Sequence, residues 1–283
     1  MKLPAFEYAA PTSVAEAVKL LASNPGAKAL AGGQSLIPAL AFRLGAPPLL
    51  VDLRKVDELR GISLDAHGVR LGARVRWRDI EDDRRLASAQ PLLASAIKHV
   101  AHYQIRNRGT VGGSLAHADP AAELPGVAVA CDAQIVTQSG RGGRTIAAAD
   151  FFTGALSTAL ADDELIVALC LPAWPRERRW AFEEFSRRRG DFALAAVAVF
   201  YDRDSTGAAR DAHIGVIGAC TRPHRVPQAE ALLNGRRLDA GIVAAAARAF
   251  EAALEPPSDL HASAAYRRSL AGTLLERALM RTL

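Results

Sequence analysis

The chain has 283 residues, which is enough for two domains with a sizeable buried core. Half of its residues are hydrophobic and 23% are charged, as in ordinary globular proteins. The formal net charge is +5, but the basic residues are scattered and only 6% of the residues are aromatic. Because nucleic-acid binding favours a basic stripe with interleaved aromatic residues, we expect no nucleic-acid partner.

The cysteines are few and far apart. Cys131, Cys170 and Cys220 lie inside apolar stretches, and this odd, unspaced set predicts no disulfide framework. An iron–sulfur cluster normally needs four ligands, mostly cysteine, so we expect none on this chain alone. Residues 1–6 lack the apolar centre of a signal peptide, and no apolar run is long enough to span a membrane. We therefore expect a cytoplasmic chain without stable membrane insertion.

The first part of the chain predicts a small β-α-β-α-β unit. Ser13 and Glu16 have the spacing of a capping box, and apolar residues follow at helical spacing. Residues 28–31 and 49–53 have the pattern of short strands. Between them, Ser35 is a candidate cap for a further helix.

The middle part predicts strands and helices in alternation. It contains candidate strands at 69–75, 134–137 and 164–171, a helix at 91–100, and helix starts at 119–123 and 150–152. At the first of these starts, Asp119 would cap the helix and Pro120 would take its first position.

The last part predicts a separate α+β domain. It follows a proline-rich boundary at 172–176 and contains three candidate strands and then three helices. The strands are 180–186, 192–201 and 212–218, and the helices are 227–233, 238–254 and 262–283. We therefore divide the chain into 1–174, with subdomains of about 1–56 and 57–174, and 175–283.

Two glycine-rich loops are the most informative local feature. One is 31–35 (Ala-Gly-Gly-Gln-Ser) and the other is 110–114 (Thr-Val-Gly-Gly-Ser). Glycine allows positive φ and close approach to the backbone, and successive N–H groups in such a loop can bind a phosphate. Two converging loops suit a diphosphate, such as the one in FAD. Neither loop has the G-x-G-x-x-G spacing of the Rossmann dinucleotide motif, so a different flavin-type fold is indicated.

The motifs together resemble the FAD-binding medium subunit of the molybdenum hydroxylase family. That family includes the medium subunit of carbon monoxide dehydrogenase and the FAD domain of xanthine dehydrogenase. The matching segments follow the family's order along nearly the whole chain: 31–38, 105–125, 150–152, 163–166 and 190–193. The resemblance implies an α+β chain. Its first part would be a two-subdomain FAD-binding fold of the vanillyl-alcohol-oxidase/PCMH type, followed by a C-terminal domain with a three-stranded sheet and three helices.

The resemblance also implies which residues bind FAD. The two glycine loops would hold the pyrophosphate, Glu123 would accept hydrogen bonds from sugar hydroxyls, and Ile166 and Phe192 would lie against the flavin ring. Asp119 has a competing structural role as a helix cap. The full set of expected cofactor-binding residues is Ala31, Gly32, Gly33, Gln34, Ser35, Leu36, Thr110, Gly112, Gly113, Ser114, Asp119, Glu123, Ile166 and Phe192. No catalytic residue and no metal ligand is expected on this chain.

The function that the resemblance implies is that of an electron-transfer subunit of an oxidoreductase. A large partner subunit would carry a molybdopterin-type molybdenum cofactor, and a small partner would carry two [2Fe–2S] clusters. FAD on this chain would pass the electrons to an external acceptor, in a heterohexamer that is a dimer of heterotrimers.

Two alternatives remain open from the sequence. One is a self-sufficient FAD-dependent oxidoreductase of the vanillyl-alcohol-oxidase type, although no added substrate cap is evident. The other is a non-enzymatic FAD-holding module. The family's CoA-reductase branch is disfavoured, because its cluster-bearing insertion and cysteines are missing. His99, His102 and His117 lack the further ligand that a zinc site needs, so we expect surface or interface positions for them.

Overall fold

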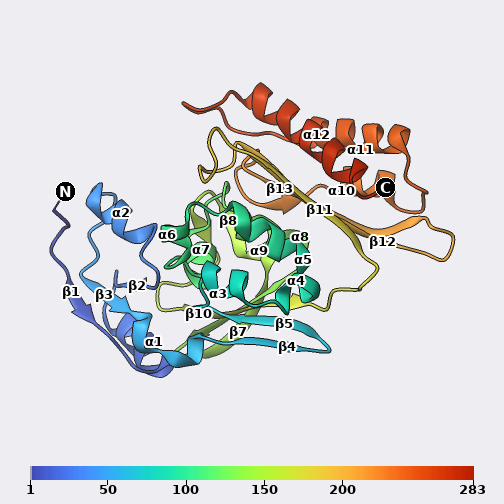
Figure 1. Cartoon of the computed structure of the whole chain (residues 1–283). Helices are drawn as coiled ribbons and strands as arrows, with labels where there is room; N and C mark the ends of the chain where they lie inside the picture. Colours follow the sequence, from blue (N-terminus) through green and yellow to red (C-terminus); the bar gives the residue numbers. More distant parts are fainter. Residues whose placement is uncertain (1) are drawn as a thin grey trace.

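A computed structural model describes residues 2–283 and shows three successive sheets (Figure 1). The first is a three-stranded parallel sheet in the order β1-β3-β2, which we call the first subdomain. Its elements are β1 (Glu7–Ala9), α1 (Val14–Ser23), β2 (Lys28–Leu30), α2 (Leu36–Ala41) and β3 (Leu49–Asp52). Two short 3-10 helices, η1 (Leu53–Lys55) and η2 (Asp57–Leu59), lead out of it. The predicted β-α-β-α-β unit is confirmed.

Helix ends in this subdomain agree only partly with the sequence prediction. Ser13 caps α1 as expected, since its Oγ accepts a 3.1 Å hydrogen bond from the N–H of Glu16. In a capping box, the Glu16 carboxylate would also accept a hydrogen bond from the N–H of Ser13. Here it accepts from the N–H of Thr12, one residue earlier. Ser35 precedes α2 in a helical conformation and its side chain makes no capping hydrogen bond, so that prediction was wrong.

The second subdomain is built on a five-stranded antiparallel sheet in the order β4-β5-β10-β6-β7. Its strands are β4 (Ile62–Asp65), β5 (Gly68–Gly72), β6 (Gln134–Ser139), β7 (Gly142–Ala147) and β10 (Leu165–Pro172), and a small ribbon is made by β8 (Phe152–Gly154) and β9 (Ser157–Thr158). Its helices are α3 (Trp77–Asp82), α4 (Leu86–Ala89), α5 (Pro91–Ala96), η3 (Ile97–His99), α6 (Tyr103–Arg106), α7 (Val111–His117), α8 (Glu123–Ala130) and α9 (Ala148–Phe151).

Two predicted helix starts in this subdomain were wrong. Asp119 accepts a 2.9 Å hydrogen bond from the N–H of Ala121 and so closes a turn, and α8 begins only at Glu123. A short side chain that bonds to the backbone two residues ahead stabilises a turn as readily as a helix end. Residues 150–152 lie at the end of α9 rather than at its beginning.

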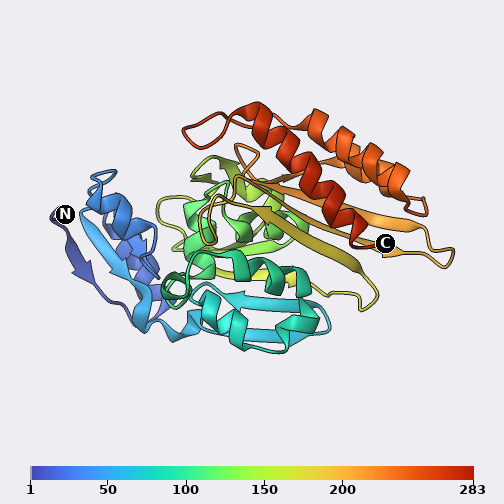
Figure 2. The same ribbon diagram turned by 45° about the horizontal axis from the view of Figure 1, so that its top comes forward.

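The C-terminal domain has an antiparallel sheet in the order β11-β12-β13-β14. Its elements are β11 (Arg179–Phe185), β12 (Ala195–Arg203), β13 (Ala209–Ile217), β14 (His224–Arg225), α10 (Pro227–Leu233), α11 (Ala240–Ala253) and α12 (Ala264–Met280). The three long strands and three helices were predicted, and the two-residue β14 was not. Figures 1 and 2 show α11 and α12 on one face of this sheet and the second subdomain on the other.

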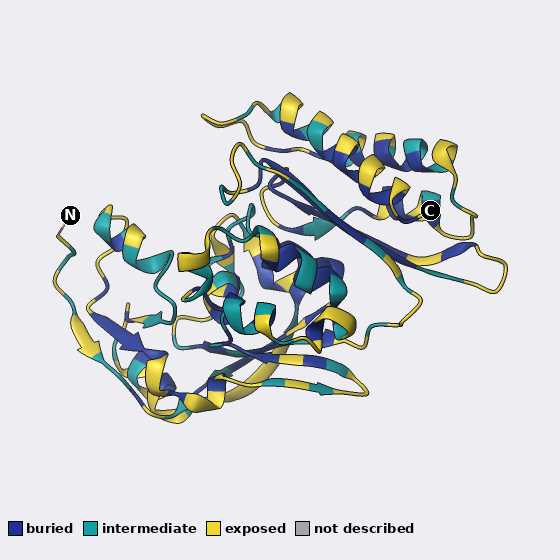
Figure 3. Ribbon diagram, in the orientation of Figure 1, coloured by how far each residue is buried: buried dark blue, intermediate teal, exposed yellow. Residues whose placement is uncertain are grey.

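Helix α8 joins the second subdomain to the C-terminal sheet. All eight of its residues are buried, as are the first seven residues of β12 in the neighbouring sheet, and Figure 3 shows most of this strand in dark blue. Gly126 makes the close approach possible, because a Cβ there would lie 2.6 Å from Cδ1 of Ile217 on β13. Strand β12 serves two cores, since alternate side chains point to opposite faces of a sheet. Ala198 faces the core that contains α8, and Val199 faces α10–α12.

Candidate functional site

The two glycine loops touch each other through their backbones. A Cβ added at Gly32 would collide with the carbonyl oxygen of Arg108 and would lie 3.0 Å from the Cα of Gly109. The carbonyl oxygen of Gly32 also accepts hydrogen bonds from Nε2 of Gln34, at 3.1 Å, and from Nε of Arg108, at 3.4 Å. The loop after β2 and the segment that leads into α7 therefore form one continuous surface, as the sequence predicted for two converging loops.

The first loop presents free main-chain donors. Gly33 has a φ of +75°, which turns the chain between β2 and α2. Within residues 2–283, no acceptor takes a hydrogen bond from the N–H groups of Gly32, Gly33, Gln34 or Ser35. All four residues are half-buried. Successive unpaired N–H groups around a left-handed residue form a concavity that suits an anion.

The second loop differs, because its N–H groups already have partners. Val111 donates to the carbonyl of Val75 at 2.9 Å, and Gly112 donates to that of Ala73 at 2.8 Å. The N–H of Gly113 donates to Oγ1 of Thr110, the residue that caps α7. The expectation that both loops supply free amides is therefore met by the first loop alone. Gly112 is needed for packing, since a Cβ there would lie 2.7 Å from the Cβ of Ala73.

The segment between β11 and β12 brings the C-terminal domain against this region. Gly190 has a φ of +90°, and a Cβ there would lie 2.5 Å from Nδ1 of His102, just before α6. Phe192 follows in the same segment with 62% of its surface exposed. An exposed phenyl ring of this kind is free to contact a planar ligand, and its place against the flavin stays a prediction.

Glu123 is the most perturbed titratable group of the candidate site. It is the first residue of α8 and is only 6% exposed. Burial, together with the negative charge of Glu184 on β11, raises the pKa of Glu123 from 4.5 to about 8. The carboxyl group therefore tends to keep its proton at neutral pH and can both donate and accept a hydrogen bond.

The other predicted residues differ in how much of their surface a cofactor could reach. Leu36 and Ser114 are half-buried beside the loops, and Asp119 is half-buried with its carboxylate already used in a turn. Ile166 on β10 is 3% exposed and belongs to the main hydrophobic core, so little of its surface is free for a flavin ring. Ala31 and Thr110 lie at the starts of the two loops.

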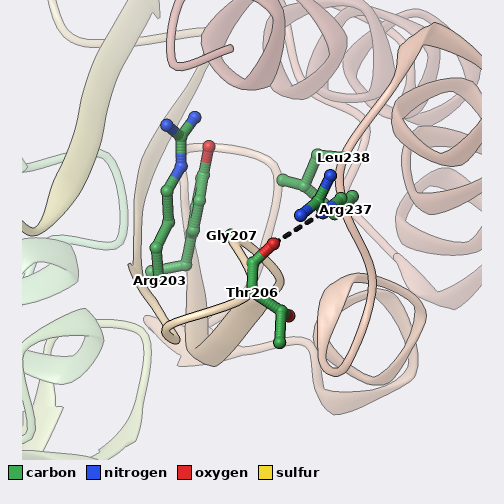
Figure 4. Close-up of a pocket in the computed structure, with 6 residues that line it drawn as sticks. Arg203, Thr206, Gly207, Arg237 and Leu238 are labelled. Carbon is green, nitrogen blue, oxygen red and sulfur yellow. Dashed lines mark hydrogen bonds between the residues drawn. The ribbon is translucent and has the colours of Figure 1, made fainter.

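A cavity of 280 Å³ lies elsewhere, in the C-terminal domain (Figure 4). It is lined by residues of the β12–β13 turn and of the α10–α11 connection, including Arg203 and Arg237. The Nε of Arg237 donates to the carbonyl oxygen of Thr206 at 2.6 Å. None of its lining residues belongs to the glycine loops or to the predicted cofactor site.

Comparison with known proteins assigns the whole chain. Residues 4–174 match the family described as "FAD binding domain in molybdopterin dehydrogenase", and residues 180–282 match "CO dehydrogenase flavoprotein C-terminal domain". The chain belongs to the FAD-binding medium subunits of the molybdenum hydroxylase family. It is an oxidoreductase subunit by this membership.

Individual medium subunits are similar over their full length. The chain is 43% identical to the nicotine 6-hydroxylase medium subunit of Paenarthrobacter nicotinovorans, over 99% of this chain and 98% of that one. It is 37% identical to the carbon monoxide dehydrogenase medium chain of Hydrogenophaga pseudoflava, over 98% and 96%. Among solved structures, carbon monoxide dehydrogenase from Hydrogenophaga pseudoflava superposes with a TM-score of 0.96 at 38% identity, covering 100% of this chain and 98% of that one. Quinoline 2-oxidoreductase from Pseudomonas putida 86 gives 0.95 at 40% identity, with the same coverage.

The residues present fit FAD. The unpaired N–H groups of the first loop suit its diphosphate, and the missing side chains of Gly32 and Gly112 allow the two loops and the neighbouring backbone to pack closely around them. The buried carboxyl of Glu123 suits its sugar hydroxyls. Sequence reasoning did not single out Glu184, whose charge contributes to the raised pKa of Glu123, since a second glutamate in an alternating strand carries no signal of its own. Its only cue was its place just before the 190–193 motif.

Proposed function

We propose that this chain is the electron-transfer subunit of a molybdenum-containing hydroxylase or dehydrogenase. It would take electrons from the [2Fe–2S] centres of a small partner subunit and pass them to an external acceptor. A large partner subunit would hold the molybdenum cofactor, in a dimer of heterotrimers. The full-length match to medium subunits carries this proposal. The cysteine count supports it, because three separated cysteines are too few for an iron–sulfur cluster.

The residues of the chain would hold the cofactor at three places. The N–H groups of Gly33, Gln34 and Ser35 would bind the diphosphate, with Ala31 and Leu36 shaping the loop. From the second loop, Thr110 and Ser114 would contribute hydroxyl groups, since its amides are used internally. Gly113, which is exposed, would permit close approach of the cofactor, and Gly112 would let α7 pack against Ala73.

Near the C-terminal domain, Glu123 would bind sugar hydroxyls and Phe192 would cover the ring. Asp119 and Ile166 would support the site indirectly. Asp119 stabilises the turn before α8, and Ile166 packs in the hydrophobic core beneath it. When bound, FAD supplies the ability to accept single electrons and release them in pairs. The chain's part is to bind and orient the flavin and to leave one face open to the acceptor.

The proposal is tested by removing FAD from the purified three-subunit complex. We expect substrate to reduce the iron–sulfur centres of the FAD-free complex as before, while reduction of the external acceptor stops. Adding FAD should restore it. If acceptor reduction continues at its full rate without FAD, the chain is not the exit point for electrons.

Two further outcomes would support the alternatives. Turnover of a small substrate by this chain alone, with FAD bound and no partner, would indicate a self-sufficient oxidoreductase. Flavin absorbance without any turnover, even in the complex, would indicate a module that only holds FAD.

A further inference from the structure

Glu184 is a buried carboxylate on β11, the strand that begins the C-terminal domain. Side chains alternate along a strand, so neighbouring residues point to opposite faces. Glu183 points toward the α12 side and pairs with Arg281. Glu184 points the other way, toward η3 and α8, and its side chain is only 3% exposed.

One oxygen of the Glu184 carboxylate lacks a partner. Within residues 2–283 its Oε2 is buried and makes no hydrogen bond. Its Oε1 lies 3.7 Å from Nδ1 of His99, which is too long for a hydrogen bond but allows an ion pair when the imidazole is protonated. No lysine or arginine of the described chain forms an ion pair with this carboxylate. Leaving a buried carboxylate oxygen without a hydrogen bond is costly, so this atom is a candidate for contact with a ligand.

A second unpaired carboxyl lies close by. Glu123 is 6% exposed, and its side chain makes no hydrogen bond to another residue of the described chain. The charge of Glu184 is the second-largest cause of its raised pKa, after burial, and the charge of Asp119 is a smaller one. The charges of Glu184 and Asp119 therefore act on Glu123 at the junction between the two domains, and no arginine or lysine in residues 2–283 forms an ion pair with Glu123 or Glu184.

Two such groups at one junction suit a ligand that carries several hydroxyl groups. A carboxylate accepts hydrogen bonds, and a neutral carboxyl group both accepts and donates. A cation is a poorer fit, because no group of three or more His, Cys, Asp or Glu side chains in the described residues could hold a metal ion. A polyhydroxylated chain needs only several acceptors and donors in a row.

We propose that Glu184 is a further cofactor-binding residue that, together with Glu123, binds hydroxyl groups of the sugar-alcohol portion of FAD. The C-terminal domain then holds the cofactor through β11 as well as covering it with Phe192. This inference rests on the proposed function, because it assumes that FAD is the ligand of the glycine loops.

The test measures the affinity of the FAD-free complex for added FAD, with quenching of flavin fluorescence as the signal. We expect E184A to weaken binding by roughly ten- to a hundredfold, which is the usual effect of losing hydrogen bonds to a charged group. E184Q keeps one acceptor and should lose less. E183Q is the matched control, since its side chain points to the other face, and it should bind FAD as the wild type does.

Thermal unfolding of the FAD-free complex separates this role from a structural one. Because E184A removes a buried carboxylate with one oxygen that makes no hydrogen bond, we expect the melting temperature of the variant without FAD to stay the same or to rise. A structural role gives the opposite pair of results, a lower melting temperature and an unchanged affinity, and would overturn the inference. If the wild-type complex itself binds no FAD, the proposed function fails. If it binds FAD and E184A binds equally well, only the role of Glu184 fails.

Discussion

The contact between the two glycine loops makes a sharp prediction for Gly32→Ala. The new Cβ would lie 2.7 Å from the carbonyl carbon of Arg108 and 3.0 Å from the Cα of Gly109, and it would overlap the Arg108 carbonyl oxygen. All three atoms belong to the backbone, so no side-chain rotation relieves the collision. The loops must separate, and the free N–H groups of the first loop move with them.

The size of the effect follows from the kind of clash. Overpacking a close contact typically costs about 1–3 kcal/mol, and we expect the upper part of that range because only backbone can yield. Loss of about 1.4 kcal/mol of binding free energy weakens affinity tenfold. We therefore expect Gly32→Ala to lower the free energy of unfolding by about 3 kcal/mol and to weaken FAD binding at least roughly tenfold.

Other glycines of the chain provide matched controls. A Cβ added at Gly61 would meet nothing within 4 Å, and the φ there is ordinary, so Gly61→Ala should change both quantities very little. Gly33→Ala tests mainly backbone strain, since its φ of +75° costs an L-residue about 1–2 kcal/mol, and the nearest atom to the new Cβ would be the side-chain Cγ1 of Ile37 at 3.2 Å. Urea unfolding and FAD titration measure the two effects. If Gly32→Ala behaves like Gly61→Ala, the loops do not form one cradle.

Three further predictions concern buried charges. Glu123→Gln should stabilise the FAD-free chain at high pH, because the raised pKa of Glu123, about 8 instead of 4.5, means that its ionisation destabilises the folded state. Unfolding curves at several pH values should show no gain in the free energy of unfolding below pH 4.5 and a gain of at most about 5 kcal/mol above pH 8. Glu164→Gln should destabilise the chain, since the hydrogen bond from Arg144 lowers the pKa of Glu164 to about 2. The free energy of unfolding should fall by at most about 3 kcal/mol at neutral pH, and this loss should vanish as the pH falls from 4.5 through about 2. Arg267→Met should lower the free energy of unfolding of the C-terminal domain by about 3 kcal/mol, as measured in urea, because the buried guanidinium bonds two main-chain carbonyls and Asp259.

Local patterns predicted the order of the elements well. In the first subdomain, β2 and β3 follow from short apolar stretches at 28–31 and 49–53 with helical patterns beside them, whereas β1 has no apolar run of its own; β12 follows from a long apolar stretch. Such patterns report which face of an element is buried, and that depends mainly on neighbours in the sequence. The fold class was predictable for the same reason.

Helix starts and hydrogen-bond partners were harder to predict. Asp119 and Pro120 have the composition of a helix start, yet the carboxylate closes a turn and α8 begins four residues after Asp119. The free amides of the second loop were lost to carbonyls of Ala73 and Val75, which lie more than thirty residues earlier. A sequence motif shows that a glycine is present, but not whether its N–H already has a distant acceptor.

The candidate site depends on contacts between domains, which explains why part of it escaped sequence analysis. Helix α8 has no polar face, because one side packs in the second subdomain and the other packs on β13. Its first residue, Glu123, is shielded from water only while the C-terminal sheet packs against α8, and the same packing brings the charge of Glu184 on β11 close to it. In the proposed site, the carboxyl groups that would bind the sugar hydroxyls come together where the two domains pack, whereas the free N–H groups that would bind the diphosphate belong to the first loop. It follows that loosening the C-terminal domain should weaken the hold on the sugar portion of FAD before it affects the diphosphate.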